Sequence, residues 1–211
     1  RIGGSKMYCI LVTGIPAAGK STIAEYLSKK MGLPVFSKDS VKELLYDEVG
    51  FQSRKEKVKL GIAAMEMIYY GAKQLMKAGQ PFILENNFEH SSKEGITNLL
   101  NEYGYPALTV TLTGDYRVIH QRFLKRNISP ERHRGHVLND CYPEKREHSI
   151  EELRAASLSY EDYLYGIAHR GFDTFSVEGE QIVVDTTDFS RLDMEEILRQ
   201  VMEWKEKLSR S

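Results

Sequence analysis

The sequence predicts an α/β fold: one domain in which helices flank a mainly parallel, five-stranded sheet. Short runs rich in β-branched and aromatic residues alternate along the chain with longer helical patterns, and parallel strands require such crossover segments between them. A glycine-rich segment, Gly14 to Ser21, joins the first of these runs to the first helical pattern. The length of 211 residues suits one domain with a small insertion.

Five runs have the composition of strands, and helical periodicity fills the segments between them. The predicted strands are Tyr8–Thr13, Leu33–Ser37, Pro81–Glu85, Leu108–Thr113 and Gln181–Thr186. The predicted helices are Lys20–Met31, Ser40–Val49, Arg54–Ala78, Lys93–Tyr103, Tyr116–Asn127, Pro143–Tyr165 and Arg191–Lys207. Gly32, Gly79 and Gly104 follow three of these helices, where glycine commonly ends a helix.

Two segments depart from this alternation. Ile128–Tyr142 contains Pro130, Gly135 and several basic residues but no apolar period, and it lies between two predicted helices. We therefore expect a lid, inserted at about residues 128–142. Phe172–Val177 is predicted to pair with Gln181–Asp185 as a hairpin, which would give the sheet an antiparallel edge.

The composition excludes several classes of protein. The chain has 29 Lys and Arg residues against 30 Asp and Glu residues, a formal charge of −1, which argues against coating nucleic acid or an anionic membrane by bulk electrostatics. Its two cysteines cannot supply a disulfide framework, and no apolar run reaches the roughly 20 residues of a membrane helix. We expect a soluble, cytoplasmic protein with no membrane partner. Arg1–Lys6 resembles a cloning scar, with Met7 as the native start, and we exclude it from the fold.

The segment Gly14–Ser21 matches the motif G-x-x-x-x-G-K-[ST] and lies between a predicted strand and a predicted helix, the context that this motif requires. Its glycines allow the backbone to approach an anion, and the following helix presents N–H groups and a positive dipole end. Lys20 is predicted to reach the β- and γ-phosphates of a nucleotide, and Ser21 to supply a hydroxyl to Mg²⁺. The motif predicts nucleoside triphosphate binding.

Several segments together resemble the small P-loop kinases, an AAA-type group that includes polynucleotide 5′-hydroxyl kinase, the zeta toxins and chloramphenicol phosphotransferase. The resemblance is carried by Gly14–Thr22, Val35–Lys42, Phe82–Asn87, Arg122 and Arg126. It implies a P-loop NTPase fold with strand order 2-3-1-4-5, a basic helical lid that closes over the nucleotide, and the use of ATP and Mg²⁺. The ATP-binding residues that it implies are Gly14, Ile15, Pro16, Ala17, Ala18, Gly19, Lys20, Ser21, Thr22, Arg122 and Arg126.

Asp39 matches the acidic residue that, in such kinases, accepts the proton of the hydroxyl being phosphorylated. It also follows an apolar run and opens a helix at the carboxyl edge of the predicted sheet, where ligands of open α/β sheets bind. The alternative is that Asp39 only caps this helix. The family often carries Arg three residues later, whereas this chain has Lys42, which offers an acceptor a point charge without a bidentate fork.

Glu85 ends the third predicted strand and matches an acidic residue that holds Mg²⁺ through water or positions the acceptor. Asn86 and Asn87 follow it and are candidates to hydrogen-bond a polar acceptor. The alternative for Glu85 is an ordinary solvated carboxylate at a strand end. The predicted metal site is thus Ser21 with Glu85, and the predicted acceptor site is Lys42, Glu85 and Asn86.

A basic segment from Arg117 to His136 carries six Lys and Arg residues and one acidic residue, Glu131. Arg122 and Arg126 are four residues apart on a predicted helix and project from one face, where they could stabilise a transferring phosphoryl group or stack on adenine. Arg126 is the first choice for a catalytic role beside Asp39 and Lys20. For Arg132 and Arg134, a solvated face is an equal alternative. His133, His136 and Cys141 lack the spacing of a zinc site.

Near the C-terminus, Thr186, Thr187 and Asp188 are expected to border the adenine, by resemblance, or to cap the last helix. The sequence therefore predicts an ATP- and Mg²⁺-dependent phosphotransferase that acts on a hydroxyl of a small acceptor: a nucleoside, sugar or antibiotic. Two alternatives stay open. One is a polynucleotide kinase acting on a nucleic-acid 5′ end, and the other is a nucleotide-dependent regulatory ATPase or switch without a small-molecule acceptor. The acceptor and the oligomeric state are not predicted.

Overall fold

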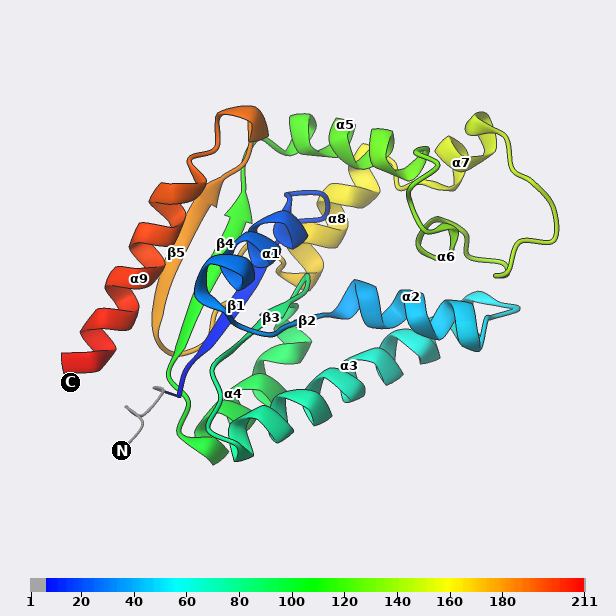
Figure 1. The fold of residues 1–211 in the computed structure, drawn as a ribbon. Coiled ribbons are helices and arrows are strands. Elements are labelled where there is room, and N and C mark those ends of the chain that lie inside the picture. The colour runs from blue at the N-terminus through cyan, green and yellow to red at the C-terminus, as the bar shows by residue number, and fades with distance from the viewer. Residues whose placement is uncertain (1–6, 211) are drawn as a thin grey trace.

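A computed structural model describes residues 7–210. The segment 1–6, interpreted above as a cloning scar, lies outside the described residues. Within them, five strands form one sheet in the order β2-β3-β1-β4-β5, and all four neighbouring pairs are parallel (Figure 1). The strands are β1 (Cys9–Gly14), β2 (Val35–Ser37), β3 (Phe82–Glu85), β4 (Ala107–Thr113) and β5 (Glu180–Asp185). The predicted class and strand order are confirmed.

Most predicted helices are present, with ends that differ by a few residues at most. The helices are α1 (Lys20–Met31), α2 (Lys38–Glu48), α3 (Arg54–Lys77), α4 (Lys93–Tyr103), α5 (Tyr116–Asn127), α6 (Arg134–Val137), α7 (Ile150–Ala156), α8 (Tyr160–Arg170) and α9 (Met194–Arg210), with 3₁₀ turns η1 (His90–Ser92) and η2 (Phe189–Arg191). None of the helices in residues 7–210 is long and apolar enough to cross a membrane.

The central strands β1, β3 and β4 are buried on both faces, and their successive residues alternate between two cores. Ile10 and Val12 of β1 pack with α1 and α9 in one core, whereas Cys9 and Leu11 pack with α3 and α4 in the other. Figure 1 shows α9 beside β5 at one end of the sheet and the pair α2 and α3 projecting from the opposite end. The carboxyl ends of the central strands therefore lie between these two sides.

The predicted helix Pro143–Tyr165 is wrong in part. Two short helices, α7 and α8, replace its second half, and an irregular segment replaces its start. Ser149 and Ser159 begin the two helices: the Ser149 hydroxyl accepts from the Glu152 amide, and that of Ser159 accepts from the Asp162 amide. Each serine accepts a hydrogen bond from an otherwise unpaired amide at the start of a new helix. These two helix starts interrupt the continuous helix that the apolar pattern indicated.

The predicted hairpin between Phe172–Val177 and the last strand is also wrong. Residues 172–177 form turns and coil, and β5 pairs with β4 in parallel. Phe175 is fully buried against Phe88, with ring centroids 5.1 Å apart, so this segment fills the core beneath the sheet instead of extending its edge. Burial of two large aromatic rings outweighs the pairing of a short exposed edge.

The segment 128–149, which we call the arm, leaves α5, crosses to α2 and returns to α7. It contains the short helix α6, which the sequence did not predict. The arm contacts α2 through several side chains: the His133 Nε2 atom lies 3.0 Å from Asp47 Oδ1, and the His136 Nε2 atom lies 2.7 Å from Glu43 Oε1. The insertion predicted at 128–142 therefore bridges the helix that carries Arg126 and the helix that carries Asp39.

Candidate active site

The segment between β1 and α1 forms a tight loop, and its course depends on two glycines. Gly14 has φ +133°, and a Cβ atom there would lie 2.0 Å from the Leu112 carbonyl oxygen. Gly19 has φ +94°, and a Cβ atom there would lie 2.2 Å from the Phe189 ring. Both positions combine the left-handed conformation with close contact, so both require glycine. The predicted phosphate loop is present at the N-terminus of α1.

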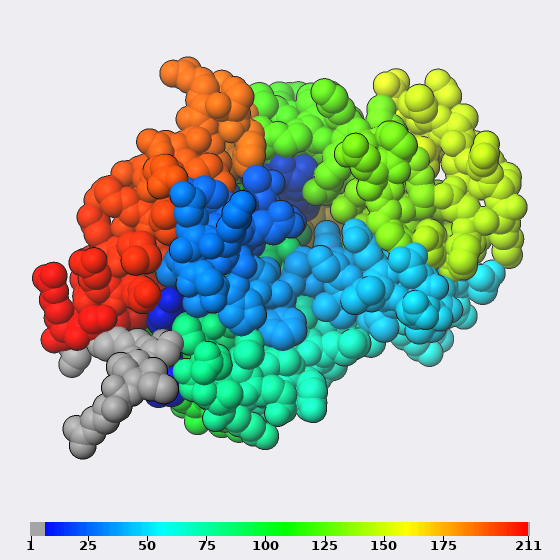
Figure 2. Space-filling view, viewed as in Figure 1, coloured from blue at the N-terminus to red at the C-terminus, as the bar shows by residue number. Residues whose placement is uncertain are grey.

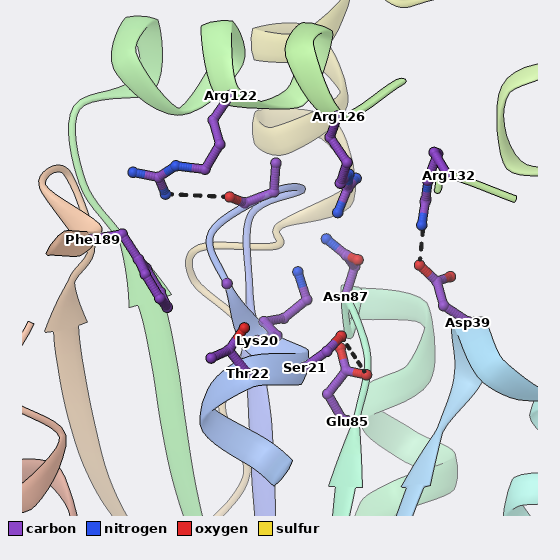
Figure 3. Close-up of a pocket in the computed structure, with 12 residues that line it drawn as sticks. Lys20, Ser21, Thr22, Asp39, Glu85, Asn87, Arg122, Arg126, Arg132 and Phe189 are labelled. Atoms are coloured by element: carbon purple, nitrogen blue, oxygen red, sulfur yellow. Dashed lines mark hydrogen bonds and ion pairs between the residues drawn. The ribbon is translucent and has the colours of Figure 1, made fainter. Parts of the chain in front are cut away.

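A cavity of about 510 Å³ opens above this loop, at the carboxyl ends of β1 and β3 (Figures 2 and 3). Figure 2 shows it as a hollow between α1 (blue), α5 with the arm (green), and α2 (light blue). Its lining residues are Ala17, Gly19, Lys20, Ser21, Thr22, Asp39, Glu85, Asn87, Arg122, Arg126, Arg132 and Phe189. Residues from six separate segments of the chain thus meet at one edge of the sheet, as expected for a ligand site of an open α/β fold.

Lys20 is buried at the floor of the cavity. Its ammonium group donates a hydrogen bond of 2.9 Å to the Ile15 carbonyl oxygen within the loop. Burial lowers the pKa of Lys20 to about 8, and the nearby Arg126 acts in the same direction, while Glu85 opposes both. An anion that enters the cavity would therefore contact a lysine that is already desolvated and positioned at the loop.

Glu85 ends β3 beside the loop and is 4% exposed. Its carboxylate accepts hydrogen bonds from the hydroxyls of Ser37 (2.5 Å) and Ser21 (3.4 Å). Burial raises the pKa of Glu85, and Lys20 counteracts this. A buried carboxylate with two hydroxyls provides the hard oxygen donors that Mg²⁺ prefers. The residues therefore fit a Mg²⁺ ion that the nucleotide phosphates and water also ligate.

Asp39 lies in the first turn of α2, on the other side of the cavity from the loop. The cap of this helix is Ser37, whose hydroxyl accepts from the Ser40 amide, so the alternative that Asp39 serves as the cap is wrong. The Asp39 carboxylate lies 3.5 Å from Lys42 Nζ, 3.7 Å from Arg132 Nη2 and 3.9 Å from His136 Nδ1. Burial would raise the pKa of Asp39, but these cations hold it well below its usual range.

The arginines of α5 have different environments. Arg122 donates hydrogen bonds to the carbonyl oxygens of Ala17 (3.3 Å), Thr186 (2.8 Å) and Thr187 (3.0 Å), so it ties the loop to the segment after β5. Arg126 has no hydrogen bond or ion pair from its guanidinium group to any residue in the range 7–210, and its Nε atom is buried. Burial, with help from Arg132, lowers the pKa of Arg126 to about 10.

Arg132, for which the sequence left a solvated face as an equal alternative, lies in the cavity and pairs with Asp39. Its Nε atom is also buried without a partner among the described residues. Two such guanidinium groups beside one cavity indicate a site for an anion with several oxygens, because leaving buried charged donors unpaired costs about 1–3 kcal/mol each. Figure 3 shows Arg126 and Arg132 on the same side of the cavity, facing the loop and Asp39.

Sequence reasoning missed Phe189, which lines the cavity from the turn after β5. Its ring covers Gly19, and the Arg122 guanidinium lies 5.7 Å from the ring centroid. The signal available was an aromatic residue directly after Thr186–Asp188, the segment expected to border adenine. Asp188 itself caps the short turn η2, whereas Asp193 accepts from the Glu196 amide at the start of α9.

Two predicted acceptor residues, Asn86 and Lys42, do not line this cavity. Asn86 is buried, lines none of the cavity, and its amide nitrogen contacts the Met65 sulfur at 4.0 Å, so its assignment to the acceptor site is corrected. Asn87, in contrast, lines the cavity and donates a hydrogen bond of 2.9 Å to the Gly14 carbonyl oxygen. Lys42 contacts Asp39 but lines a neighbouring cavity on the α3 side of α2.

Residues 10–151 match the sequence profile of a family described as AAA domain. No curated protein matches the chain. Among solved structures, a protein described as a candidate kinase from Chloroflexus aurantiacus has a TM-score of 0.74 and 24% identity over 97% of this chain and 99% of that one.

Two more distant structures share the fold. A sugar kinase from Janibacter sp. has a TM-score of 0.54 and 16% identity, with 95% of each chain covered. Shikimate kinase from Bacteroides thetaiotaomicron has a TM-score of 0.52 and 16% identity over 95% of this chain and 99% of that one. The parallel sheet flanked by helices is therefore common to this chain and to structures named as kinases.

Proposed function

Because the chain belongs to the AAA-domain family, as its resemblance to the small P-loop kinases predicted, we propose that it is an ATP-dependent phosphotransferase. The reaction moves the γ-phosphate of ATP to a hydroxyl of a small acceptor. One observation carries this proposal: a carboxylate, Asp39, faces the same cavity as the phosphate-loop lysine, Lys20, with Arg126 and Arg132 beside them. This arrangement can place an alcohol in line with a γ-phosphate.

The nucleotide half of the site is the loop with the residues around it. The loop amides and Lys20 bind the β- and γ-phosphates, because Lys20 can exchange its 2.9 Å bond to the Ile15 carbonyl for a phosphate oxygen. Adenine stacks against Phe189 beneath Arg122. Ser21 and, through water, Glu85 hold Mg²⁺, which supplies positive charge to the phosphates when it is bound with ATP.

The acceptor half is Asp39. Its carboxylate accepts a hydrogen bond from the acceptor hydroxyl and orients the oxygen toward the γ-phosphorus atom. As the new P–O bond forms, the bond from the γ-phosphorus to the bridging oxygen of ADP breaks, and the hydroxyl proton passes to Asp39. Arg126 and Arg132 stabilise the charge on the transferring phosphoryl group. The products are ADP and the phosphorylated acceptor.

The low pKa of Asp39 fits this order of events. In the free protein, the cations around it keep the carboxylate ionised and a poor proton acceptor. The phosphates of ATP offset the charges of Arg132 and Lys20, so binding of ATP moves the pKa of Asp39 upward, toward the range in which it can take a proton. Asp39 therefore becomes a better base only when the phosphoryl donor is in place.

The experiment that tests this proposal follows the γ-phosphate of labelled ATP, with Mg²⁺, into pooled metabolites, antibiotics and 5′-hydroxyl oligonucleotides. A labelled product that is lost in Lys20→Ala and Asp39→Asn, and retained in the exposed-surface control Lys29→Ala, supports the kinase and identifies the acceptor. If phosphate appears only in water, and Asp39→Asn leaves that rate intact while Lys20→Ala abolishes it, the protein is an ATPase and the proposal is wrong.

A further inference from the structure

A second cavity of about 410 Å³ lies between α2, α3 and η1, and the residues that line it are not those of the ATP cavity. Figure 1 shows α2 and α3 running side by side away from the sheet. The residues that line this second cavity include five basic side chains, Lys38, Lys42, Arg54, Lys57 and Arg170, but only two acidic ones, Glu66 and Glu89. In a chain with a formal charge of −1, this is a marked local excess of positive charge.

Three of the five cations have partners in the wall of the cavity or in the arm. Arg170 forms an ion pair with Glu89, with its Nε atom 2.9 Å from the carboxylate. Lys57 donates to the carbonyl oxygens of His136 (3.1 Å) and Leu138 (2.5 Å), and Arg54 donates to the Asn139 side chain. These three side chains hold the walls of the cavity and the arm in place. Lys38 and Lys42 remain.

Lys38 and Lys42 are four residues apart on α2, so their ammonium groups lie on one face of the helix, where like charges destabilise it. Lys42 lies 3.5 Å from Asp39 Oδ1, at the boundary with the ATP cavity. Lys38 is half-buried and has no hydrogen bond or ion pair with any residue of the described part of the chain. Burial, reinforced by Lys42, lowers the pKa of Lys38. An unpaired, partly desolvated cation beside a like charge is costly unless an anion binds there.

The remaining wall of this cavity suits the body of an organic molecule. Met65 and Tyr69 supply apolar and aromatic surface, and Ser91 and Ser92 of η1 supply hydroxyls. Because Lys42 lines this cavity and contacts Asp39, a molecule bound here can extend past Lys42 and present a hydroxyl to the Asp39 carboxylate.

We propose that the acceptor is an alcohol that also carries an anionic group, a phosphate or a carboxylate, and that Lys38 and Lys42 bind this group in the second cavity. This inference rests on the proposed phosphotransferase function and names the substrate class. The hydroxyl lies at Asp39 and the anionic group at Lys38, so the spacing between them on the acceptor determines which alcohols are phosphorylated.

The first test measures anion binding without catalysis. The protein is saturated with a non-hydrolysable ATP analogue and Mg²⁺, which occupies the phosphate loop, and inorganic pyrophosphate is then titrated while backbone amide NMR shifts are recorded. We expect saturable shifts at Lys38, Ser91 and Ser92, and an affinity that falls roughly tenfold or more in Lys38→Gln, the loss expected for one charge-assisted hydrogen bond. Lys38→Arg retains binding, as does Lys29→Gln on the exposed end of α1. Absence of these shifts overturns the proposal.

The second test compares matched acceptors that share a hydroxyl: a nucleoside with its 3′-monophosphate, and glucose with glucuronate. We expect labelled phosphate to transfer to an anionic member at least tenfold more efficiently than to its neutral counterpart, and the pair that responds distinguishes phosphate from carboxylate. Lys38→Gln should raise KM for the anionic acceptor roughly tenfold with kcat nearly unchanged. If both members of a pair are used equally, the proposal of an anionic acceptor is wrong but the proposed phosphotransferase function stands. If no acceptor receives phosphate while pyrophosphate still binds at Lys38, only the proposed phosphotransferase function is wrong.

Discussion

The hydroxyl of Tyr163 in α8 donates a hydrogen bond of 2.8 Å to the Pro16 carbonyl oxygen in the phosphate loop. Tyr163 is 1% exposed, and its ring lies against His120 and Phe123 of α5. The loop that surrounds the anion site is therefore held from outside by a buried side chain 147 residues away in the sequence.

Tyr163→Phe removes this hydrogen bond and keeps the ring. We expect the free energy of unfolding to fall by about 1 kcal/mol, because the Pro16 carbonyl loses its partner, and ATP binding to weaken a few-fold. Urea unfolding and calorimetric titration with an ATP analogue measure the two effects. Tyr165→Phe on the same helix is the control, since Tyr165 is 67% exposed, and it should change neither quantity. Identical behaviour of the two variants contradicts a supporting role for Tyr163.

Gly19→Ala places a Cβ atom in a backbone with φ +94° and 2.2 Å from the Phe189 ring. We expect the free energy of unfolding to fall by about 2 kcal/mol or more, because both the conformation and the contact are unfavourable. Gly166→Ala is the matched control: Gly166 lies in α8 with open space around it, and alanine there should stabilise by up to about 1 kcal/mol. Chemical denaturation of both variants checks the opposite signs.

Phe189→Ala removes the ring that we assign to adenine. We expect the Kd for ATP to rise about tenfold or more, since stacking of a base on an aromatic ring is worth roughly 1–3 kcal/mol. Inhibition by tripolyphosphate, which has no base, should be unaffected, and Phe189→Tyr should retain ATP affinity. If tripolyphosphate and ATP lose affinity equally, Phe189 acts through the loop and not through adenine.

Arg126→Ala removes a guanidinium group that has no ion-pair partner within residues 7–210. We expect kcat to fall about 100-fold or more, because charge on the transferring phosphoryl group loses its stabilisation, while thermal stability changes little or rises. Steady-state kinetics on the acceptor found in the transfer assay measure this. Lys125→Ala, on the exposed neighbouring position, should leave kcat unchanged. A stability loss without a kcat effect would make Arg126 structural.

Affinity for ATP should fall at alkaline pH through Lys20. The pKa of Lys20 in the free protein is lowered to about 8, and phosphates bind the protonated ammonium. Below pH 8, Lys20 is already protonated before ATP binds. Above pH 8, most Lys20 is neutral in the free protein and must take up a proton when ATP binds, so the Kd for ATP rises by up to about tenfold per pH unit. Calorimetric titrations between pH 7 and 9.5 test this, and Lys20→Arg, which stays charged, should give weaker affinity with a flat profile.

The parts of this molecule that local chemistry decides could be predicted from the sequence. The loop Gly14–Ser21 and α1, α4 and α5 have the predicted bounds, because each depends on glycines, caps and periodicity within a short segment. The breaks around α7 and α8 were missed because the same apolar spacing fits one helix or two, although the serine caps Ser149 and Ser159 mark both helix starts.

The candidate site likewise contains residues that the local sequence predicts and residues whose position depends on packing. Lys20, Asp39 and Glu85 follow directly from strand ends, which topology brings to one edge of the sheet. Asn86 and Asn87 could not be told apart, because a difference of one residue where the chain leaves a strand reverses the direction of the side chain. Lys38 and Arg132 gave no local signal, since their roles depend on where α3 and the arm pack against α2.

The arm has a thermodynamic consequence. It joins α5, whose Arg126 we assign to the phosphates, to α2, whose Asp39 and Lys42 we assign to the acceptor, and His133 and His136 fix it to α2. A substrate that draws Arg132 toward its phosphates also repositions the neighbours of Asp39, so each substrate changes the affinity for the other. Linkage makes this coupling equal in both directions: the factor by which the acceptor changes the affinity for ATP is the factor by which ATP changes the affinity for the acceptor.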